Sequence, residues 1–312
     1  MANEHAVVLE RNKMVQNRLR RLLAVSGLRV AVADEPEQVA ALLEANSIIC
    51  ADAFDAELVL RLLRTSPGLR AWMWTAEPLE RLLKIAVEEP RVSNLFGRAN
   101  FESTPRDWEL LYAARRVLRP EEPPPFAAML NWGFVGFKEA VADTEGRERA
   151  VKLVQRFIDQ MGCPKRVGEM FGELAHELLM NAIYDAPVDR NTGHPLFAHD
   201  RKANVRLSPQ DAATLRLASD GAVVAIQVTD PFGRLRRKHV FAGLARGLKG
   251  GEMDQSHGGA GLGMLKVYQS TVAMFFDVVD GQRTEVTGIF DLDLNLREFR
   301  QLAKSLHYYG PV

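Results

Sequence analysis

Residues 173–186 read Glu173-Leu-Ala-His-Glu177-Leu-Leu-Met-Asn181-Ala-Ile-Tyr-Asp185-Ala186, within a stretch whose periodicity predicts a long helix over 166–186. Glu173, Glu177 and Asn181 recur every fourth residue, so their side chains stack on one face of that helix. An adjacent apolar stripe can be buried: Leu174, Leu178 and Ala182. An asparagine oxygen and a carboxylate one turn apart are suited to hold a hydrated magnesium ion and to orient a water or hydroxyl group. Taken alone, the pattern also fits a solvated helix face.

A second polar motif follows a predicted buried strand, where the chain reads Asp230-Pro-Phe-Gly233. An aspartate at the end of such a strand can accept a hydrogen bond from a ring amino group at the base of a pocket. Gly233 would let the backbone pass close to that ring. Asp-Pro and Gly are also ordinary turn residues, so this motif does not decide the function alone.

Glycines then cluster before a short predicted helix over 262–271, in the stretch 258–263 that reads Gly-Gly-Ala-Gly-Leu-Gly. Free N–H groups at a helix N-terminus favour anions, and glycines let a phosphate approach the backbone. The stretch lacks the Lys-Ser/Thr ending of a Walker loop and does not open a βαβ unit, so neither of those fingerprints applies.

In chain order, the three motifs are E-x-x-x-N on a helix, D-x-x-G after a strand and G-x-G-L-G before a helix. The combination resembles the N, G1 and G2 boxes of the GHKL ATP-binding fold, which type II topoisomerases, histidine kinases and anti-sigma factor kinases share. The resemblance covers residues 126–303 and implies an α/β sandwich with a mostly antiparallel sheet that binds ATP and Mg²⁺. It implies that Glu177 is the general base, that Asn181 is the magnesium ligand and that Asp230 reads adenine. The other nucleotide-binding residues that it implies are Asp185, Gly233, Gly258, Gly259, Gly261, Leu262, Gly263 and Thr284.

The sequence departs from the GHKL pattern in two places. The second motif has Pro-Phe-Gly after Asp230 rather than x-Gly-x-Gly, and the interval from Asn181 to Asp230 is longer than usual, with 187–204 as the inserted segment. Residues 235–257 would form the ATP lid. Its basic side chains either meet phosphates or belong to a solvated loop: Arg236, Arg237, Lys238, Arg246 and Lys249.

The first 119 residues alternate short apolar, β-branched runs with segments of helical periodicity. Five strands alternating with five helices predict a doubly wound parallel sheet covered on both faces. This order resembles a response-regulator receiver domain, and an unrelated doubly wound domain is the alternative. Four prolines in residues 119–125 predict an extended linker over 120–125. The chain is expected to close with a helix of about a dozen residues and a C-terminal tail over 304–312.

The acidic pocket that a receiver uses for phosphoryl transfer is incomplete in this sequence. The first predicted strand is followed by Glu10, Arg11 and an uncharged Asn12, and an arginine there would compete with magnesium. Asp52 could be the acceptor and Thr75 looks like the switch threonine, but the lysine expected after the fifth strand is missing. We therefore predict a degenerate receiver that does not take phosphate.

Composition excludes several classes of protein. The 312 residues carry 40 basic and 40 acidic side chains, so the chain is not a globally basic nucleic-acid binder. No apolar run approaches the roughly 20 residues of a membrane span, and the first residues do not read as a secretory signal. Cys50 lies in an apolar run, which predicts a buried, unreactive thiol, and two cysteines fit a reducing cytoplasm.

Together these features predict an ATP-binding signalling protein with a protein partner, with no nucleic acid, and with a homodimer as one expected form. Two helices lead directly into the site, an arrangement most like the anti-sigma factor type of serine/threonine kinase, in which Glu177 would position a partner's hydroxyl. The alternative is a non-catalytic module in which ATP orders the lid and creates a docking surface. A histidine kinase remnant fits least, because His176 as an acceptor would demand a second asparagine box before Asp230.

Overall fold

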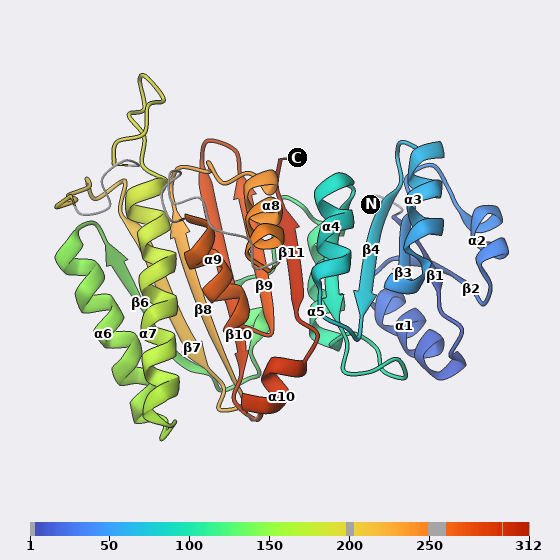
Figure 1. The fold of residues 1–312 in the computed structure, drawn as a ribbon, viewed down its shortest axis with the longest axis horizontal. Coiled ribbons are helices and arrows are strands. Elements are labelled where there is room, and N and C mark those ends of the chain that lie inside the picture. The colour runs from blue at the N-terminus through green and yellow to red at the C-terminus, as the bar shows by residue number, and fades with distance from the viewer. Residues whose placement is uncertain (1–3, 198–202, 249–259, 295, 312) are drawn as a thin grey trace. The chain divides into compact units, whose positions relative to one another are not determined.

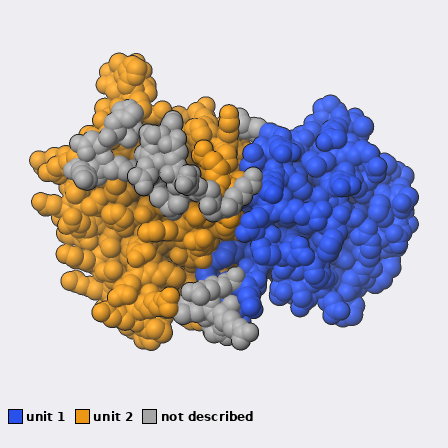
Figure 2. All heavy atoms as spheres, in the orientation of Figure 1, with its two compact units in different colours: residues 1–129, 297–307 blue, residues 130–296, 308–312 orange. Residues whose placement is uncertain are grey.

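The structure is a computed structural model that describes residues 4–197, 203–248, 260–294 and 296–311 (Figure 1). The chain divides into two compact units, which Figure 2 shows in different colours. Unit 1 comprises residues 1–129 and 297–307, and unit 2 comprises residues 130–296 and 308–312. The first division falls beyond the predicted linker, because the short 3₁₀ helix η2, Phe126–Met129, contacts the last helix of the N-terminal stretch.

Unit 1 opens with the predicted alternation of strands and helices. The elements are β1 His5–Leu9, α1 Lys13–Val25, β2 Arg29–Ala33, α2 Pro36–Leu42, β3 Ile48–Asp52, η1 Ala53–Asp55, α3 Ala56–Thr65, β4 Arg70–Thr75, α4 Glu80–Glu88, β5 Val92–Gly97 and α5 Asp107–Leu118. The five strands pair in parallel in the order β2-β1-β3-β4-β5, so the predicted doubly wound sheet is confirmed. Every residue of β1 and β3 is buried, as expected of strands covered on both faces.

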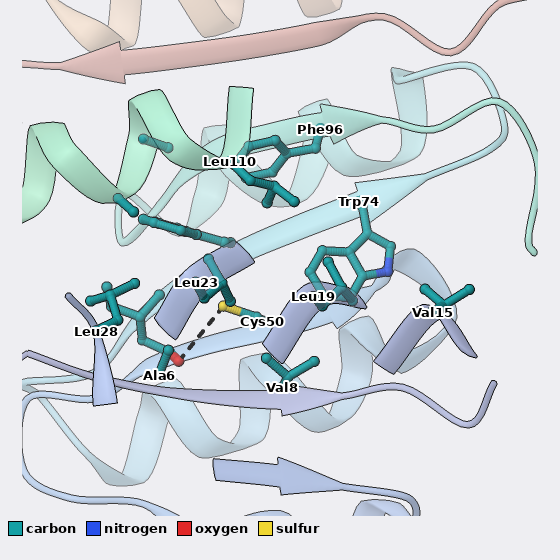
Figure 3. Packing of buried hydrophobic residues seen from close by; sticks show 14 residues of the cluster. Ala6, Val8, Val15, Leu19, Leu23, Leu28, Cys50, Trp74, Phe96 and Leu110 are labelled. Carbon is teal, nitrogen blue, oxygen red and sulfur yellow. Dashed lines mark hydrogen bonds between the residues drawn. The ribbon is translucent and has the colours of Figure 1, made fainter. Parts of the chain in front are cut away.

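The core of unit 1 lies between the parallel sheet and helices α1 and α5. Leu19 of α1 and Leu110 of α5 belong to one buried cluster with Trp74 of β4 and Phe96 of β5 (Figure 3). Cys50 lies in the same cluster, its thiol is 3.9 Å from the carbonyl oxygen of the same strand's first residue, and burial raises its pKa. The prediction that Cys50 is buried is confirmed.

The C-terminal segment is the largest departure from the sequence prediction. Helix α10, Leu296–Gln301, has six residues instead of about a dozen, and strand β11, Ser305–Tyr309, follows it. Leu306 pairs antiparallel with Leu95 of β5. The predicted tail over 304–312 is therefore wrong, because all five residues of β11 are buried.

Buried polar side chains fasten β11 to unit 1. His307 places Nδ1 3.0 Å from Oδ1 of Asn94 and Nε2 3.5 Å from Oε2 of Glu109. Arg106 donates to the other Glu109 oxygen at 2.7 Å. Burial raises the pKa of Glu109, but the positive charge of Arg106 and the hydrogen bond from His307 outweigh it and leave that pKa below its usual range. Residues 305–307 are thus part of the interior of unit 1.

Replacing Gly97 with alanine should detach this segment and destabilise unit 1. A Cβ atom at Gly97 would lie 1.9 Å from the carbonyl oxygen of Ala303, and the Gly97 amide donates to Oγ of Ser305 at 2.9 Å. We expect a loss of about 2–4 kcal/mol in the free energy of unfolding, measured by urea titration of tryptophan fluorescence. Gly243→Ala is the control, because its Cβ meets nothing within 4 Å. A Gly97→Ala variant as stable as this control would contradict the prediction.

Unit 2 is an antiparallel sheet with helices on one face (Figure 1). Its elements are β6 Val135–Val141, α6 Thr144–Gln160, α7 Lys165–Met180, η3 Asn181–Asp185, β7 Ala213–Ser219, β8 Val223–Asp230, α8 Arg237–Leu248, α9 Ala260–Gln269, β9 Ala273–Val279 and β10 Arg283–Asp291. The strands follow the order β9-β10-β8-β7-β6, and the predicted Asp220-Gly221 hairpin joins β7 to β8. The mixed α/β class with a mostly antiparallel sheet is confirmed. No helix in the described ranges has the length and apolar composition to cross a bilayer.

Candidate functional site

The helix of the first motif changes form where its polar residues end. Helix α7 stops at Met180, and Asn181–Asp185 form one π-helical turn, η3, in which the Ala186 amide donates to the Asn181 carbonyl oxygen at 2.9 Å. The predicted regular helix over 166–186 is therefore wrong in its last turn. Single π-turns within helices occur frequently at functional sites.

A cavity of about 520 Å³ in unit 2 brings together residues from distant parts of the sequence. Four predicted site residues line it: Asn181, Asp185, Asp230 and Thr284. The π-turn supplies the first two, the end of β8 the third and the start of β10 the fourth. Apolar side chains of α7, α8, α9 and the sheet complete the wall, which is the usual composition of a small-molecule site.

Asp230 and Thr284 form a polar pair in this wall. They stand opposite each other in the register of β8 and β10, and both are buried. Burial raises the pKa of Asp230 to about 6, although its Oδ1 accepts a hydrogen bond from the Phe232 amide at 2.9 Å. The interaction of the Thr284 hydroxyl with this carboxyl lowers the pKa of Asp230 by less than burial raises it. A buried carboxyl and a buried hydroxyl at one position of the wall favour a ligand with polar ring atoms.

Glu177 lies outside the lining of the cavity and beside α9. A Cβ atom at Gly263 would lie 2.0 Å from Oε2 of Glu177, so this glycine makes room for the carboxylate. The fold thereby brings the first and third motifs together. A carboxylate near the N-terminal turns of a helix is favoured by the helix dipole.

The other glycines of the motifs have different places. Gly233 has a φ of +62°, and a Cβ there would lie 2.1 Å from the carbonyl oxygen of Val279. Its role is close packing on the turn between β9 and β10. Gly233 was predicted to bind nucleotide, but it does not line the cavity. Helix α9 begins at Ala260, two residues before the predicted start, so Gly261 and Leu262 lie in its first turn. Gly258 and Gly259 lie outside the described residues.

Part of the predicted ATP lid is helix α8. Two basic residues of the predicted lid contact other parts of unit 2 instead of the cavity. Arg236 donates to Asp280 at 2.6 Å and to the carbonyl oxygen of Gly233 at 3.2 Å. Arg237 is buried, with its guanidinium carbon 4.1 Å from the ring centroid of Phe241. Neither residue lines the cavity, so phosphate contact is not supported for either. Arg236 lies in the partly exposed loop before α8, as the solvated-loop alternative predicts, whereas that alternative is wrong for the buried Arg237.

A different basic set faces the cavity. Arg246 was a candidate, whereas Arg234 and His239 were missed by the sequence analysis. The spacing of His239, Gly243 and Arg246 places these residues on one face of α8, a signal that the lid assignment obscured. Lys238 is exposed, and Lys249 lies outside the described residues.

The acidic pocket of unit 1 contains an internal cation. Arg98, which is only 4% exposed, donates to Asp52 at 2.6 Å and to Glu10 at 3.3 Å. Arg11, predicted to compete with magnesium, instead donates to both oxygens of Asp55 at 2.8 and 2.9 Å. The prediction of a competing arginine thus applies to Arg98 and is wrong for Arg11.

Asp52 should not accept a phosphoryl group. One of its oxygens already accepts from the Phe54 amide at 2.9 Å, and the other accepts from Arg98. Burial raises the pKa of Asp52 more than the charge of Arg98 lowers it, and the same burial limits the access of solvent-borne reagents to this side chain. Incubation with acetyl phosphate and Mg²⁺ should give no phosphorylated protein by mass spectrometry, with Asp52→Asn as the background control. Phosphate that appears in the wild type and not in Asp52→Asn would contradict this expectation.

Comparisons with known proteins add little to these observations. No protein-family model matches the chain, and no curated protein matches it in sequence. Among solved structures, the chain is similar to one in "The crystal structure of SiaB-SiaC complex from Pseudomonas aeruginosa", with 10% sequence identity and a TM-score of 0.33. The match covers 50% of this chain and 88% of that chain. A likeness at this level carries no argument about function, which therefore rests on the residues of the site.

Proposed function

We propose that unit 2 binds ATP with Mg²⁺ and that the protein is an ATP-binding signalling protein, most like a serine/threonine kinase of the anti-sigma factor type. The supporting observation is the cavity that gathers Asn181, Asp185, Asp230 and Thr284. Its volume of about 520 Å³ falls in the range of small-ligand sites. Asp230 can accept from a purine amino group, and the hydroxyl of Thr284 can bond to the ring or to a water on it.

The polar side chains of the π-turn fit a magnesium ion shared with phosphates. Asn181 offers an amide oxygen and Asp185 a carboxylate, both at the cavity wall. Within the described ranges, no three His, Cys, Asp or Glu side chains cluster closely enough to hold a metal ion by themselves. A site with only two protein ligands suits Mg²⁺, which commonly binds through one or two protein oxygens, substrate phosphates and water. Arg234, His239 and Arg246 supply donors for the phosphate chain on the same cavity.

A non-catalytic module is the second candidate, and one observation favours it. Glu177, the residue assigned as general base, lies against Gly263 and does not line the cavity. In this alternative, ATP occupancy changes the cavity wall formed by α8 and thereby a docking surface for the partner, with no phosphoryl transfer.

Nucleotide binding is tested by calorimetry with a non-hydrolysable ATP analogue. The wild type should bind, and Asn181→Ala should lose about tenfold in affinity in the presence of Mg²⁺ while keeping its affinity in EDTA, because only the metal contact is removed. Lys238→Ala, an exposed residue outside the cavity, is the control. The absence of heat from the wild type at millimolar analogue would overturn the proposal.

Glu177→Gln separates the kinase from the module. Labelled ATP incubated with the protein and a lysate of its native host should label a partner protein if the chain is a kinase. Glu177→Gln should then reduce labelling by about 100-fold or more while analogue binding is retained. Binding by the wild type without any labelled partner would instead support the module.

A further inference from the structure

We propose that Tyr184 is a positioning residue for the nucleotide site, whose hydroxyl holds the π-turn in the form that presents Asn181 and Asp185 to the cavity. This inference rests on the proposed function. Tyr184 belongs to the turn itself but does not line the cavity, and it is 1% exposed. Its contacts explain how an uncommon helix form is maintained at this point.

The hydroxyl of Tyr184 is the centre of a directed chain of hydrogen bonds. It donates to the carbonyl oxygen of Ala203 at 3.0 Å and lies 3.1 Å from Oγ1 of Thr144, at the start of α6. Since the tyrosine proton is committed to Ala203, the threonine hydroxyl is the donor between the two side chains. Oγ1 of Thr144 in turn accepts from the amide of Val205 at 3.1 Å. Each N–H and O–H donor in this chain has an acceptor, and hydrogen bonds joined in this way are expected to strengthen one another.

A second contact braces the junction between α7 and the π-turn. Arg147 of α6 places Nη1 2.9 Å from the sulfur of Met180, the last residue of α7. The guanidinium carbon of the same arginine lies 5.8 Å from the ring centroid of Tyr184. The start of α6 therefore holds both the residue before the turn and the aromatic ring within it.

The inserted segment that the sequence analysis found between Asn181 and Asp230 takes part in this support. Ala203 lies at its end and Val205 directly after it, where the chain returns toward β7. The longer interval thus provides two backbone partners for the Tyr184–Thr144 pair, neither of which lines the cavity.

The position of Asp185 depends on the turn remaining wide. In a regular α-helix the amide of Asp185 would bond to the carbonyl oxygen of Asn181, but here the amide of Ala186 does. Conversion to a regular turn would keep Asn181 and Asp185 on one helix face, because they are four residues apart, but it would change the direction in which Asp185 points relative to Asn181. Asp185 would then approach the phosphate and metal from a different direction, and the residues that follow would shift by one position, or about 100° around the helix axis.

Tyr184→Phe tests the role of the hydroxyl while keeping the ring. We expect the affinity for ATP analogue in EDTA to stay within about twofold of the wild type, because the contacts of Asp230 and Thr284 are unchanged. The gain in affinity on adding Mg²⁺ should fall by about tenfold, the equivalent of one lost hydrogen bond. Hydrogen exchange of the Ala186 amide should become faster. A general loss of stability would lower both affinities together, so the split identifies a positioning role.

Thr144 supplies the matched variants. Thr144→Val should reproduce the loss of the magnesium response, Thr144→Ser should retain the wild-type response, and Thr144→Val combined with Tyr184→Phe should be no worse than either alone. A wild-type magnesium response in a folded Tyr184→Phe variant overturns the inference about Tyr184 and leaves the proposed function standing. No nucleotide binding by the wild type overturns the proposed function and this role with it.

Discussion

Asp230→Asn should make unit 2 more stable at pH 7 and abolish nucleotide binding. Burial raises the pKa of Asp230 from the ordinary 3.8 to about 6, so the folded state keeps a proton that the unfolded chain has already lost. The free energy of unfolding therefore falls as the pH rises from about 4 to 6 and stays low above that range. Asparagine carries no charge and keeps an oxygen for the Phe232 amide, so the variant should gain about 1–3 kcal/mol at pH 7.

The measurement is urea unfolding at pH 7 and pH 4, with calorimetric titration of ATP analogue at pH 7. The gain should largely disappear at pH 4, where the folded carboxyl is protonated and that of the unfolded chain is about half protonated. Asp220→Asn is a control of opposite sign: burial raises the pKa of Asp220, but hydrogen bonds from the amides of Asn131, Val223 and Ala222 outweigh it and hold the pKa below its usual value. That variant should lose stability and keep nucleotide binding. An Asp230→Asn protein that is less stable at pH 7, or that binds nucleotide normally, would refute this account of the cavity.

Arg98→Met should cost unit 1 about 3–5 kcal/mol, because it leaves two carboxylates buried without a counter-charge. Asp52 and Glu10 are both buried, and Arg98 is the cation that contacts them. The guanidinium carbon of Arg98 also lies 5.3 Å from the ring centroid of Phe101, and Arg98→Met removes this cation–π contact as well. A methionine fills similar volume, so the loss reports the charge more than the packing.

Chemical denaturation followed by tryptophan fluorescence measures the effect of Arg98→Met. Arg18→Met is the matched control. Arg18 pairs with Asp107 at 2.6 Å, but both side chains are exposed, so the midpoint of chemical denaturation of this variant should equal that of the wild type. The difference between Arg98→Met and the wild type should shrink as the pH falls, because burial raises the pKa of Asp52 and its protonated form needs no counter-charge. Equal stability of Arg98→Met and the wild type at pH 7 would show that the buried pairs do not hold the pocket.

The sequence was most informative where the signal is local. The alternation in unit 1 could be predicted because β1 and β3 are continuous apolar runs separated by helices of clear periodicity. Strand β11 could not be predicted, because its partner β5 lies some two hundred residues away in the sequence. The two strands are buried only when they are paired. The competing arginine was placed at Arg11, next to Glu10 in sequence. In the fold, the ends of parallel strands meet at one edge, and β5 brings Arg98 to that place.

The candidate site shows the same division. Asp230 and Thr284 come together because β8 and β10 pair in the register that the hairpin and the following strands impose, and both residues were predicted. The π-turn was missed because a single wide turn leaves the apolar periodicity of α7 intact. His239 was missed because its significance depends on where α8 lies on the cavity. The place of Glu177 likewise follows from a tertiary contact with Gly263.

The two-part composition of unit 1 has a consequence for biosynthesis. Its sheet gains its last strand from residues 297–307, so the N-terminal half cannot finish folding while the ribosome is still making residues 130–296. Until then, β5 lacks its antiparallel partner, and the carboxylate of Glu109 lacks its contact with His307. Domains usually fold in the order in which they emerge. In this chain the half that is synthesised first is completed last, and a fragment ending at Met129 would be an unfinished protein.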